Sequence, residues 1–234
     1  MNALAGGGTF ATLPALIALG LPASVANATS NVALLPGAAA SSWAYRRELG
    51  PVAGVPAKVI AGLTFLFGIV GSLLLVLTPT DIFDTLIPWL LLMAFAIMVL
   101  GEKASSWLHS RFDIGRPILL TMQAVLGIYG GYFGGGVSLI TTALYGLLAN
   151  LRPREIFAIR TMTLAAANLA AAGVFFFYGM VSWTTCIPML MGSTVGGWLA
   201  AGWGKRLSHL AVRQGTLLIT GITTLIFFMR AYGP

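Results

Sequence analysis

Charged side chains are scarce in this sequence. Aspartate, glutamate, lysine and arginine together make up 8% of its 234 residues, whereas hydrophobic residues make up 58%. A soluble domain carries about 25% charged residues, so this chain lacks the polar surface that such a domain shows to water. Apolar stretches long enough to cross about 30 Å of hydrocarbon recur along it, and no alternation of polarity predicts a β-barrel. The sequence therefore predicts an all-α, polytopic membrane protein.

Residue types that usually carry chemistry are scarce as well. The single cysteine, Cys186, excludes an internal disulfide and a cysteine-ligated metal site. The two histidines, His109 and His209, lie in basic stretches with no carboxylate close by in a span. The acidic residues lie in or beside expected loops, so the spans hold neither a catalytic dyad nor a buried carboxylate for a proton relay. We therefore expect a protein that is not an enzyme and that uses no metal or cofactor.

The net charge of +7 is best explained by membrane topology. A basic chain can bind nucleic acid, but here the charge is spread thinly through short loops, and we expect no nucleic-acid partner. Basic loops face the cytoplasm, which predicts a multi-pass protein of the cell inner (plasma) membrane. All of the 13 basic residues except Arg230 flank or fill four loops: Arg46, Arg47 and Lys58; Lys103, Arg111 and Arg116; Arg152, Arg154 and Arg160; Lys205, Arg206 and Arg213.

Nine apolar segments follow one another along the chain. Two of them come directly after glycines and, at about 1.5 Å per residue, are too short to cross the bilayer alone. The segments are Thr9–Leu21, Ala26–Tyr45, Val55–Leu77, Leu86–Leu100, Pro117–Phe133, Val137–Ala149, Ile156–Tyr178, Trp183–Trp203 and Gln214–Met229. The two short ones are the first and the sixth, so each half of the chain contains one.

The halves align with each other. When Gly6-Gly7-Gly8 is placed on Gly134-Gly135-Gly136, the short segments coincide, and four extra residues near "LRPRE" move the offset from 128 to 132. The polar cluster that begins at Ala26 then falls on the one that begins at Ala158. The loop after the short segment is basic in the second copy and uncharged in the first, which places the two loops on opposite faces. The sequence thus predicts two inverted repeats.

These repeats define the expected organisation. Residues 1–101 form the first repeat, 102–116 a cytoplasmic loop and 117–234 the second repeat. The second copy has a full apolar segment before its glycines, whereas the first has only Met1 to Ala5. We expect that the first arm of hairpin one is absent, either through a late start codon or because the chain is a shortened form.

The repeated pattern resembles a known family. It reads "GGGTFATLPALIALGLPASVANATSN" in the first copy and "GGGVSLITTALYGLLANLRPREIFAIRTMT" in the second. This is similar to the TauE/SafE family of sulfite and organosulfonate exporters, and the resemblance covers nearly the whole chain. The second copy departs from the pattern, with Thr142 where the first has Pro14. The resemblance implies a transporter of small sulfur-containing anions.

The residues lead to a similar expectation. Inverted repeats with glycine-interrupted segments are used by secondary transporters to build a site near the midplane, and a helix N-terminus after a glycine turn offers N–H donors to an anion. We expect a small anionic substrate to bind between the two short helices. The candidate ligands are Gly6, Gly7, Gly8, Asn27, Thr29, Ser30, Asn31, Gly134, Gly135, Gly136, Ser138, Arg160, Thr161, Thr163 and Asn168.

Alternatives stay open for most of these residues. Membrane glycines also serve close helix packing, buried Ser and Thr bond back to their own helix, and Arg160 is able to snorkel to the cytoplasmic surface. The sequence does not separate a carrier from a passive anion channel, nor sulfite and organosulfonates from another small organic anion. Beyond the substrate and the lipid bilayer it indicates no partner, and it leaves the oligomeric state open.

Overall fold

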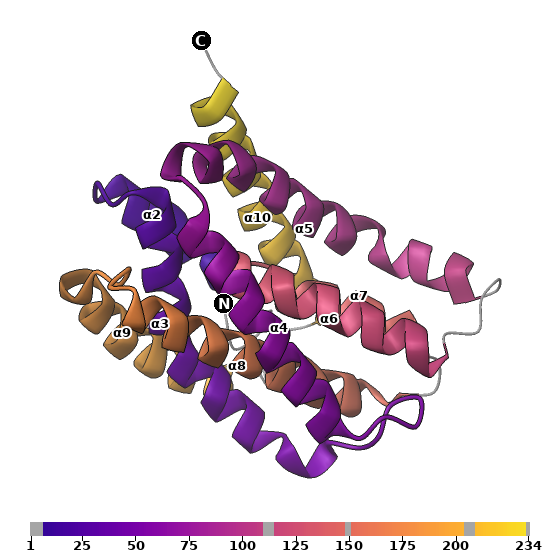
Figure 1. The fold of residues 1–234 in the computed structure, drawn as a ribbon. Helices are drawn as coiled ribbons and strands as arrows, with labels where there is room; N and C mark the ends of the chain where they lie inside the picture. The colour runs from indigo at the N-terminus through magenta and orange to yellow at the C-terminus, as the bar shows by residue number, and fades with distance from the viewer. Residues whose placement is uncertain (1–6, 110–114, 148–150, 204–208, 233–234) are drawn as a thin grey trace.

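A computed structural model describes residues 7–109, 115–147, 151–203 and 209–232, and over these residues the chain is helical (Figure 1). An isolated bridge between Val52 and Val55 is the sole β-type pairing in these ranges. The helices are α2 Thr9–Ala18, α3 Ala23–Ala44, the short 3-10 helix η1 Arg46–Glu48, α4 Ala57–Leu77, α5 Thr80–His109, α6 Arg116–Tyr132, α7 Val137–Leu147, α8 Pro153–Phe177, α9 Trp183–Trp203 and α10 His209–Tyr232.

The expected segments are all present, but some boundaries differ. Helix α5 begins at Thr80 rather than Leu86 and continues to His109, so the expected loop 102–116 is helical over its first part. Helix α10 begins at His209 rather than Gln214. Both differences have one cause: hydropathy marks the apolar stretch of a helix, whereas the helical hydrogen bonds continue into polar residues such as Glu102 beyond it.

Several helices are suited to a bilayer. Four in the described ranges are long and apolar enough to cross it: Ala57–Leu77, Thr80–Leu100, Arg154–Phe177 and Gln214–Tyr232. Their outer faces carry large apolar side chains, and Leu66, Leu218 and Met229 are 60%, 65% and 67% exposed. Such surface is unusual for a soluble protein and suits contact with lipid. These spans are typical of a multi-pass membrane protein.

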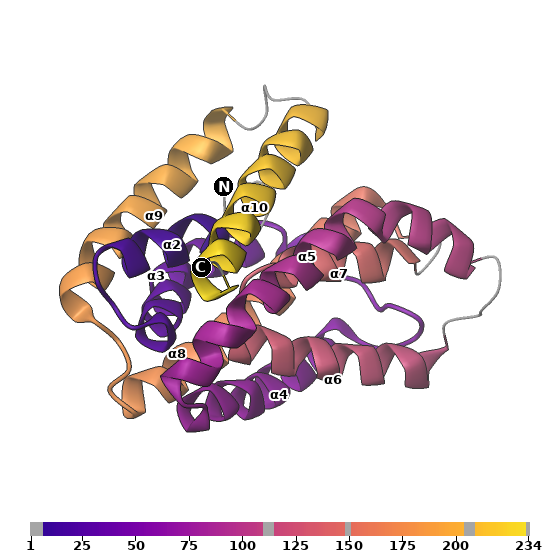
Figure 2. The ribbon, with the colours of Figure 1, turned by 90° about the horizontal axis from the view of Figure 1, so that it is seen from above.

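Helices α3 and α8 form the centre of the bundle. They pack against each other, and α3 also contacts α9 while α8 also contacts α4. Figure 2 shows α4 and α6 on one side of this pair and α9 and α10 on the other. Helix α3 carries a buried polar cluster, in which Asn27, Thr29, Ser30 and Asn31 are almost fully buried.

Helices α4 and α6 approach each other unusually closely. A Cβ atom on Gly71 would overlap the carbonyl oxygen of Ile128, and one on Gly131 would overlap that of Gly68. Small residues allow such backbone contact between membrane helices, where van der Waals packing drives association. For this helix pair, the glycines therefore serve close helix packing.

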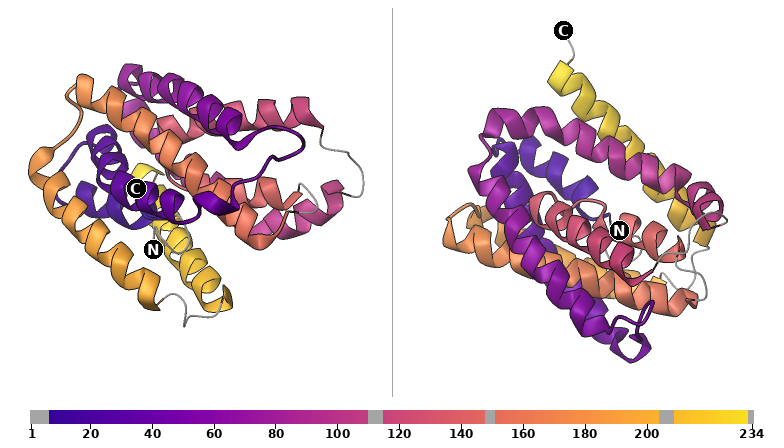
Figure 3. Two further views of the ribbon diagram at one scale, coloured as in Figure 1. Left: turned by 90° about the horizontal axis from the view of Figure 1, so that it is seen from below. Right: turned by 45° about the vertical axis from the view of Figure 1, so that its right-hand side comes forward.

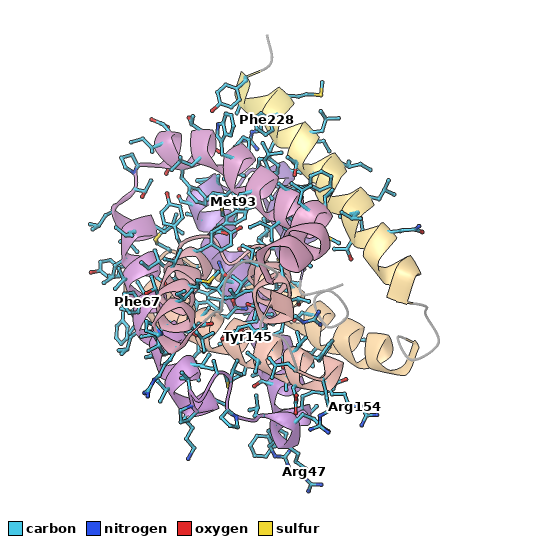
Figure 4. All side chains as sticks on the ribbon, turned by 90° about the vertical axis from the view of Figure 1, so that its right-hand side faces the viewer. Arg47, Phe67, Met93, Tyr145, Arg154 and Phe228 are labelled. Carbon is cyan, nitrogen blue, oxygen red and sulfur yellow. The ribbon has the colours of Figure 1, made fainter. Side chains whose placement is uncertain are left out.

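A buried polar chain also connects α4, α6 and α7. The hydroxyl of Tyr145 donates to Gln123 Oε1 at 2.7 Å, Gln123 Nε2 donates to Thr64 Oγ1 at 2.6 Å, and Thr64 Oγ1 donates to the carbonyl of Ile60 at 2.7 Å. Figure 4 shows Tyr145 inside the bundle. Each group in this chain has a partner, so the network stabilises one arrangement of the three helices instead of leaving a polar group unpaired.

Two helix ends that carry basic residues lie together at one end of the molecule. In Figure 4, Arg47, which follows α3, and Arg154, at the start of α8, lie together and far from Phe228 on α10. At the start of α8, Glu155 accepts hydrogen bonds from the N–H of Arg152 at 2.8 Å and from its guanidinium at 2.7 Å.

The short helices α2 and α7 lie against the last helices of the opposite halves, α2 on α10 and α7 on α5 (Figure 3).

Candidate functional site: two glycine turns that meet

The second glycine triplet breaks the chain between α6 and α7. Helix α6 ends at Tyr132, α7 begins at Val137, and Gly134 and Gly136 adopt φ angles of +73° and +81°. Residues that carry a side chain rarely adopt this left-handed backbone conformation. A Cβ on Gly134 would overlap Asn31 Oδ1, and one on Gly136 would lie 2.7 Å from the Cβ of Ala94. Both backbone angle and space therefore require glycine at these two positions.

Side chains satisfy the carbonyl groups that this break leaves free. Asn27 Nδ2 donates to the carbonyl of Tyr132 at 3.0 Å, and Asn31 Nδ2 lies 3.5 Å from that of Phe133. The hydroxyl of Tyr129 donates to the carbonyl of Gly135 at 2.6 Å. Irregular backbone inside a membrane protein must form its hydrogen bonds within the protein. These three side chains supply such bonds to the carbonyl groups of the turn.

The described part of the first triplet and the second triplet share one neighbour, Phe10. Gly6 is outside the described residues, but Gly7 and Gly8 are buried at the start of α2. The ring of Phe10 lies 3.1 Å from the position of a Cβ on Gly7 and 3.3 Å from that of a Cβ on Gly136. Phe10 is fully buried, and its carbonyl accepts a hydrogen bond from Thr223 of α10 at 3.1 Å. One aromatic ring thus contacts both turns.

Sequence reasoning missed Phe10, Tyr129 and the interaction of the two asparagines with the opposite turn. Phe10 looked like one more apolar residue of a short segment. The partners of Asn27 and Asn31 lie more than 100 positions away, and a single sequence gives no signal for such pairs. Tyr129 carried a weak signal, since it stands near the start of the "YGGYFGGG" stretch and buried tyrosine hydroxyls seek a partner.

Each half also has a hydroxyl pair between its short helix and its long one. Thr12 of α2 bonds Ser30 of α3, and Thr141 of α7 lies 3.4 Å from Thr163 of α8. The members of these pairs are 18 and 22 positions apart, and the difference of four equals the insertion near "LRPRE". Compared with the sequence alignment, both members in the second half are displaced by one residue.

Other candidates point elsewhere. Thr29 accepts a hydrogen bond from the N–H of Ser182 at 3.0 Å and so faces α9. Thr161 donates to carbonyls of its own helix, at Phe157 and Ala158. These hydroxyls already bond protein groups, as buried threonines in membrane helices often do.

The remaining candidates, Ser138, Arg160 and Asn168, are also buried. Ser138 lies in the first turn of α7. Asn168 holds its Oδ1 without a hydrogen bond from any described residue. The guanidinium of Arg160 lies 4.0 Å from the ring centre of Phe157, which in turn lies 4.6 Å from that of Tyr45.

The electrostatics of the turn favour an anion near α7. The hydrogen bonds of α7 begin with the N–H of Leu139 to the carbonyl of Gly136, so the N–H groups of Val137 and Ser138 donate to no described residue. These groups give a helix N-terminus its partial positive charge. No aspartate or glutamate is buried in the part of the chain that the structure describes, and therefore no described carboxylate in the interior opposes that charge.

A helix pair broken at a glycine turn inside an otherwise helical membrane bundle is typical of the transporter class. Residues 1–227 match the family model "Sulfite exporter TauE/SafE", and the chain belongs to this family of membrane transporters, which are not enzymes. This agrees with the resemblance found in the sequence.

Curated relatives support the same class. The chain is 27% identical to a "Probable membrane transporter protein" of Haemophilus influenzae, with 98% of this chain and 87% of that protein covered. It is 25% identical to "Probable membrane transporter protein YfcA" of Escherichia coli K12, with 97% and 81% covered. It is 27% identical to "Probable membrane transporter protein ORF9" of a Sinorhizobium species, with 97% and 84% covered. No solved structure matches the chain.

Proposed function

We propose that the protein is a secondary-type transporter that exports a small sulfur oxyanion, sulfite or an organosulfonate. The observation that carries the proposal is the meeting of the two glycine turns around Phe10. The N–H groups of Val137 and Ser138 offer hydrogen bonds to an oxyanion there, and the name of the family supports sulfite as the substrate. We propose that Gly134, Gly136 and Ser138 line this position. Thr29 and Thr161 are weaker candidates for direct contact with the substrate, because their hydroxyls bond Ser182 and the α8 backbone.

We further propose that residues 1–101 and 117–234 are inverted repeats joined by residues 102–116. Reciprocal packing supports this division, because each short helix lies against the last helix of the other half. The two hydroxyl pairs, Thr12 with Ser30 and Thr141 with Thr163, support it as well. Inverted repeats give a transporter two related conformations that open to opposite faces.

The basic helix ends are expected at the cytoplasmic face of the inner membrane. Arg47 and Arg154 lie at the same end of the molecule, which agrees with the positive-inside rule for the loops that they flank. Cysteine substitution of Ser106 and Ile82 tests the orientation. In intact cells a membrane-impermeant thiol reagent should modify position 82 and leave position 106 unmodified, and the reverse pattern would refute it.

Counterflow in proteoliposomes tests the transport activity. Vesicles that contain the purified protein are preloaded with unlabelled sulfite, and the entry of radiolabelled sulfite is followed. A carrier gives faster entry into preloaded than into empty vesicles, whereas a passive anion channel gives no such stimulation. Absence of sulfite and organosulfonate movement, with movement of a carboxylate such as acetate, would replace the proposed substrate by another small organic anion.

A further inference from the structure

Asn27 holds a buried acceptor to which no described residue donates. Its side chain is fully buried on α3, and its Nδ2 donates to the carbonyl of Tyr132 at 3.0 Å. A carbonyl oxygen only accepts, so the amide atom that faces it must be the NH2 group, and this contact fixes the orientation of the amide. The Oδ1 atom is left buried without a hydrogen bond from any described residue. A buried acceptor without a hydrogen bond is energetically unfavourable, so the site favours a ligand that can donate to it.

This oxygen lies beside a turn whose two ends differ in polarity. Helix α6 ends there, and the C-terminal end of a helix carries a partial negative charge. Helix α7 begins there; the N–H groups of Val137 and Ser138 donate to no described residue, and this helix end carries a partial positive charge. An oxyanion is stabilised at the second end and repelled at the first. The first end, with Asn27 Oδ1, stabilises a hydrogen-bond donor.

We propose that the transported oxyanion carries its own O–H or N–H donor, and that Asn27 Oδ1 accepts the hydrogen bond from it. The inference rests on the proposed function and narrows its substrate class. Hydrogen sulfite meets the requirement, as does an organosulfonate with a hydroxyl or ammonium group. The sulfite dianion and simple alkanesulfonates do not, because they would leave Asn27 Oδ1 without a donor and add a negative oxygen or an apolar group beside it.

A pair of compounds with equal size and charge tests this directly. In the counterflow assay, 2-hydroxyethanesulfonate and 1-propanesulfonate compete with radiolabelled sulfite; they differ in one hydroxyl against one methyl group. We expect the concentration for half inhibition to be about tenfold lower for the hydroxyl compound. A second measurement varies pH at constant total sulfite. The initial rate should fall as pH rises through the pKa of hydrogen sulfite, and should stay level when the hydrogen sulfite concentration is held constant.

Two variants locate the effect at Asn27. Asn27→Leu removes the acceptor at similar volume and should reduce the tenfold preference to less than about twofold. Ser24→Ala, one turn earlier on the same helix, removes a buried hydroxyl that bonds Thr80 and should keep the preference. The comparison of the two sulfonates in the wild-type protein does not require the variant. It therefore tests the inference even if Asn27→Leu does not fold.

The opposing outcomes are distinct. Equal inhibition by the two compounds would overturn the inference and leave the proposed function intact. Equal inhibition that requires Na⁺ would also overturn it, since a cation would then take the place of the ligand's donor at Asn27. If neither compound competes and radiolabelled sulfite does not exchange, the proposed function is wrong and the inference fails with it.

Discussion

The two glycine turns are related in position but are supported by different chemistry. The second turn lies against two amides of α3, Asn27 and Asn31, which donate to the carbonyls of Tyr132 and Phe133. When the halves are matched through their hydroxyl pairs, Ser30 corresponds to Thr163. Counted from that pair, the equivalents of Asn27 and Asn31 are Arg160 and Leu164, a guanidinium and an apolar side chain.

If the halves are the inverted repeats proposed above, this difference gives them unlike chemistry toward a ligand. An amide both donates and accepts, whereas a guanidinium only donates and carries a positive charge. In the proposed site, the half with Asn27 would therefore offer an acceptor to the ligand, and the half with Arg160 would offer attraction to an anion. If basic ends face the cytoplasm, the arginine lies toward the side from which an exported anion enters.

The largest expected effect comes from filling the second turn. Gly136→Val should abolish sulfite transport, because valine is strained at a φ of +81° and its Cβ would crowd Ala94 and the ring of Phe10. Gly146→Val on the same helix α7 has open space around it and should keep most of the activity. Counterflow rates normalised to the amount of inserted protein measure both variants. Normal transport by Gly136→Val would mean that the glycine serves packing alone.

The sequence predicted the helix break at this site better than the side-chain contacts around it. The break at Gly134–Gly136 and the short helix after it were predictable, because glycine spacing and segment length are local properties. The duplication predicted a site between the two short helices, but the position of Phe10 beside both glycine segments was not predicted, since an apolar ring in an apolar segment carries no signal. The partners of Asn27 and Asn31 depend on how α3 packs on α6, and one sequence does not encode that pairing in a readable form.

A smaller effect is expected when the ring between the turns is removed. Phe10→Ala should leave a cavity beside Gly7 and Gly136 and destabilise the protein by about 3–5 kcal/mol, seen as a lower midpoint of thermal unfolding in detergent. Phe177→Ala, at an 86% exposed position, is the matched control and should leave the midpoint nearly unchanged. An unchanged midpoint in Phe10→Ala would indicate that the two turns do not depend on this contact.

Removal of one amide from the second turn should cost less. Asn31→Ala leaves the carbonyls of Asn27 and Phe133 without their Nδ2 partner, for a loss of about 1–3 kcal/mol. Leu164→Ala at the equivalent position of the other half removes apolar volume but no hydrogen bond. Hydrogen exchange should therefore increase at residues 132–136 in Asn31→Ala and remain unchanged there in Leu164→Ala. Equal exchange in both variants would contradict the amide's role at the turn.

The smallest effect concerns the cation of the other half. If Arg160 attracts the anion without binding it tightly, Arg160→Gln should lower the rate of sulfite entry from the cytoplasmic face several-fold at low ionic strength and little near physiological salt. The reason is that ions screen such attraction over about 10 Å at 0.1 M salt. Arg154→Gln, at an exposed position of the same helix, separates this effect from the general charge of the helix end and should change the rate less. A loss in Arg160→Gln that is equally large at every salt concentration would instead show direct contact with the anion, and the two halves would then both supply ligands to it.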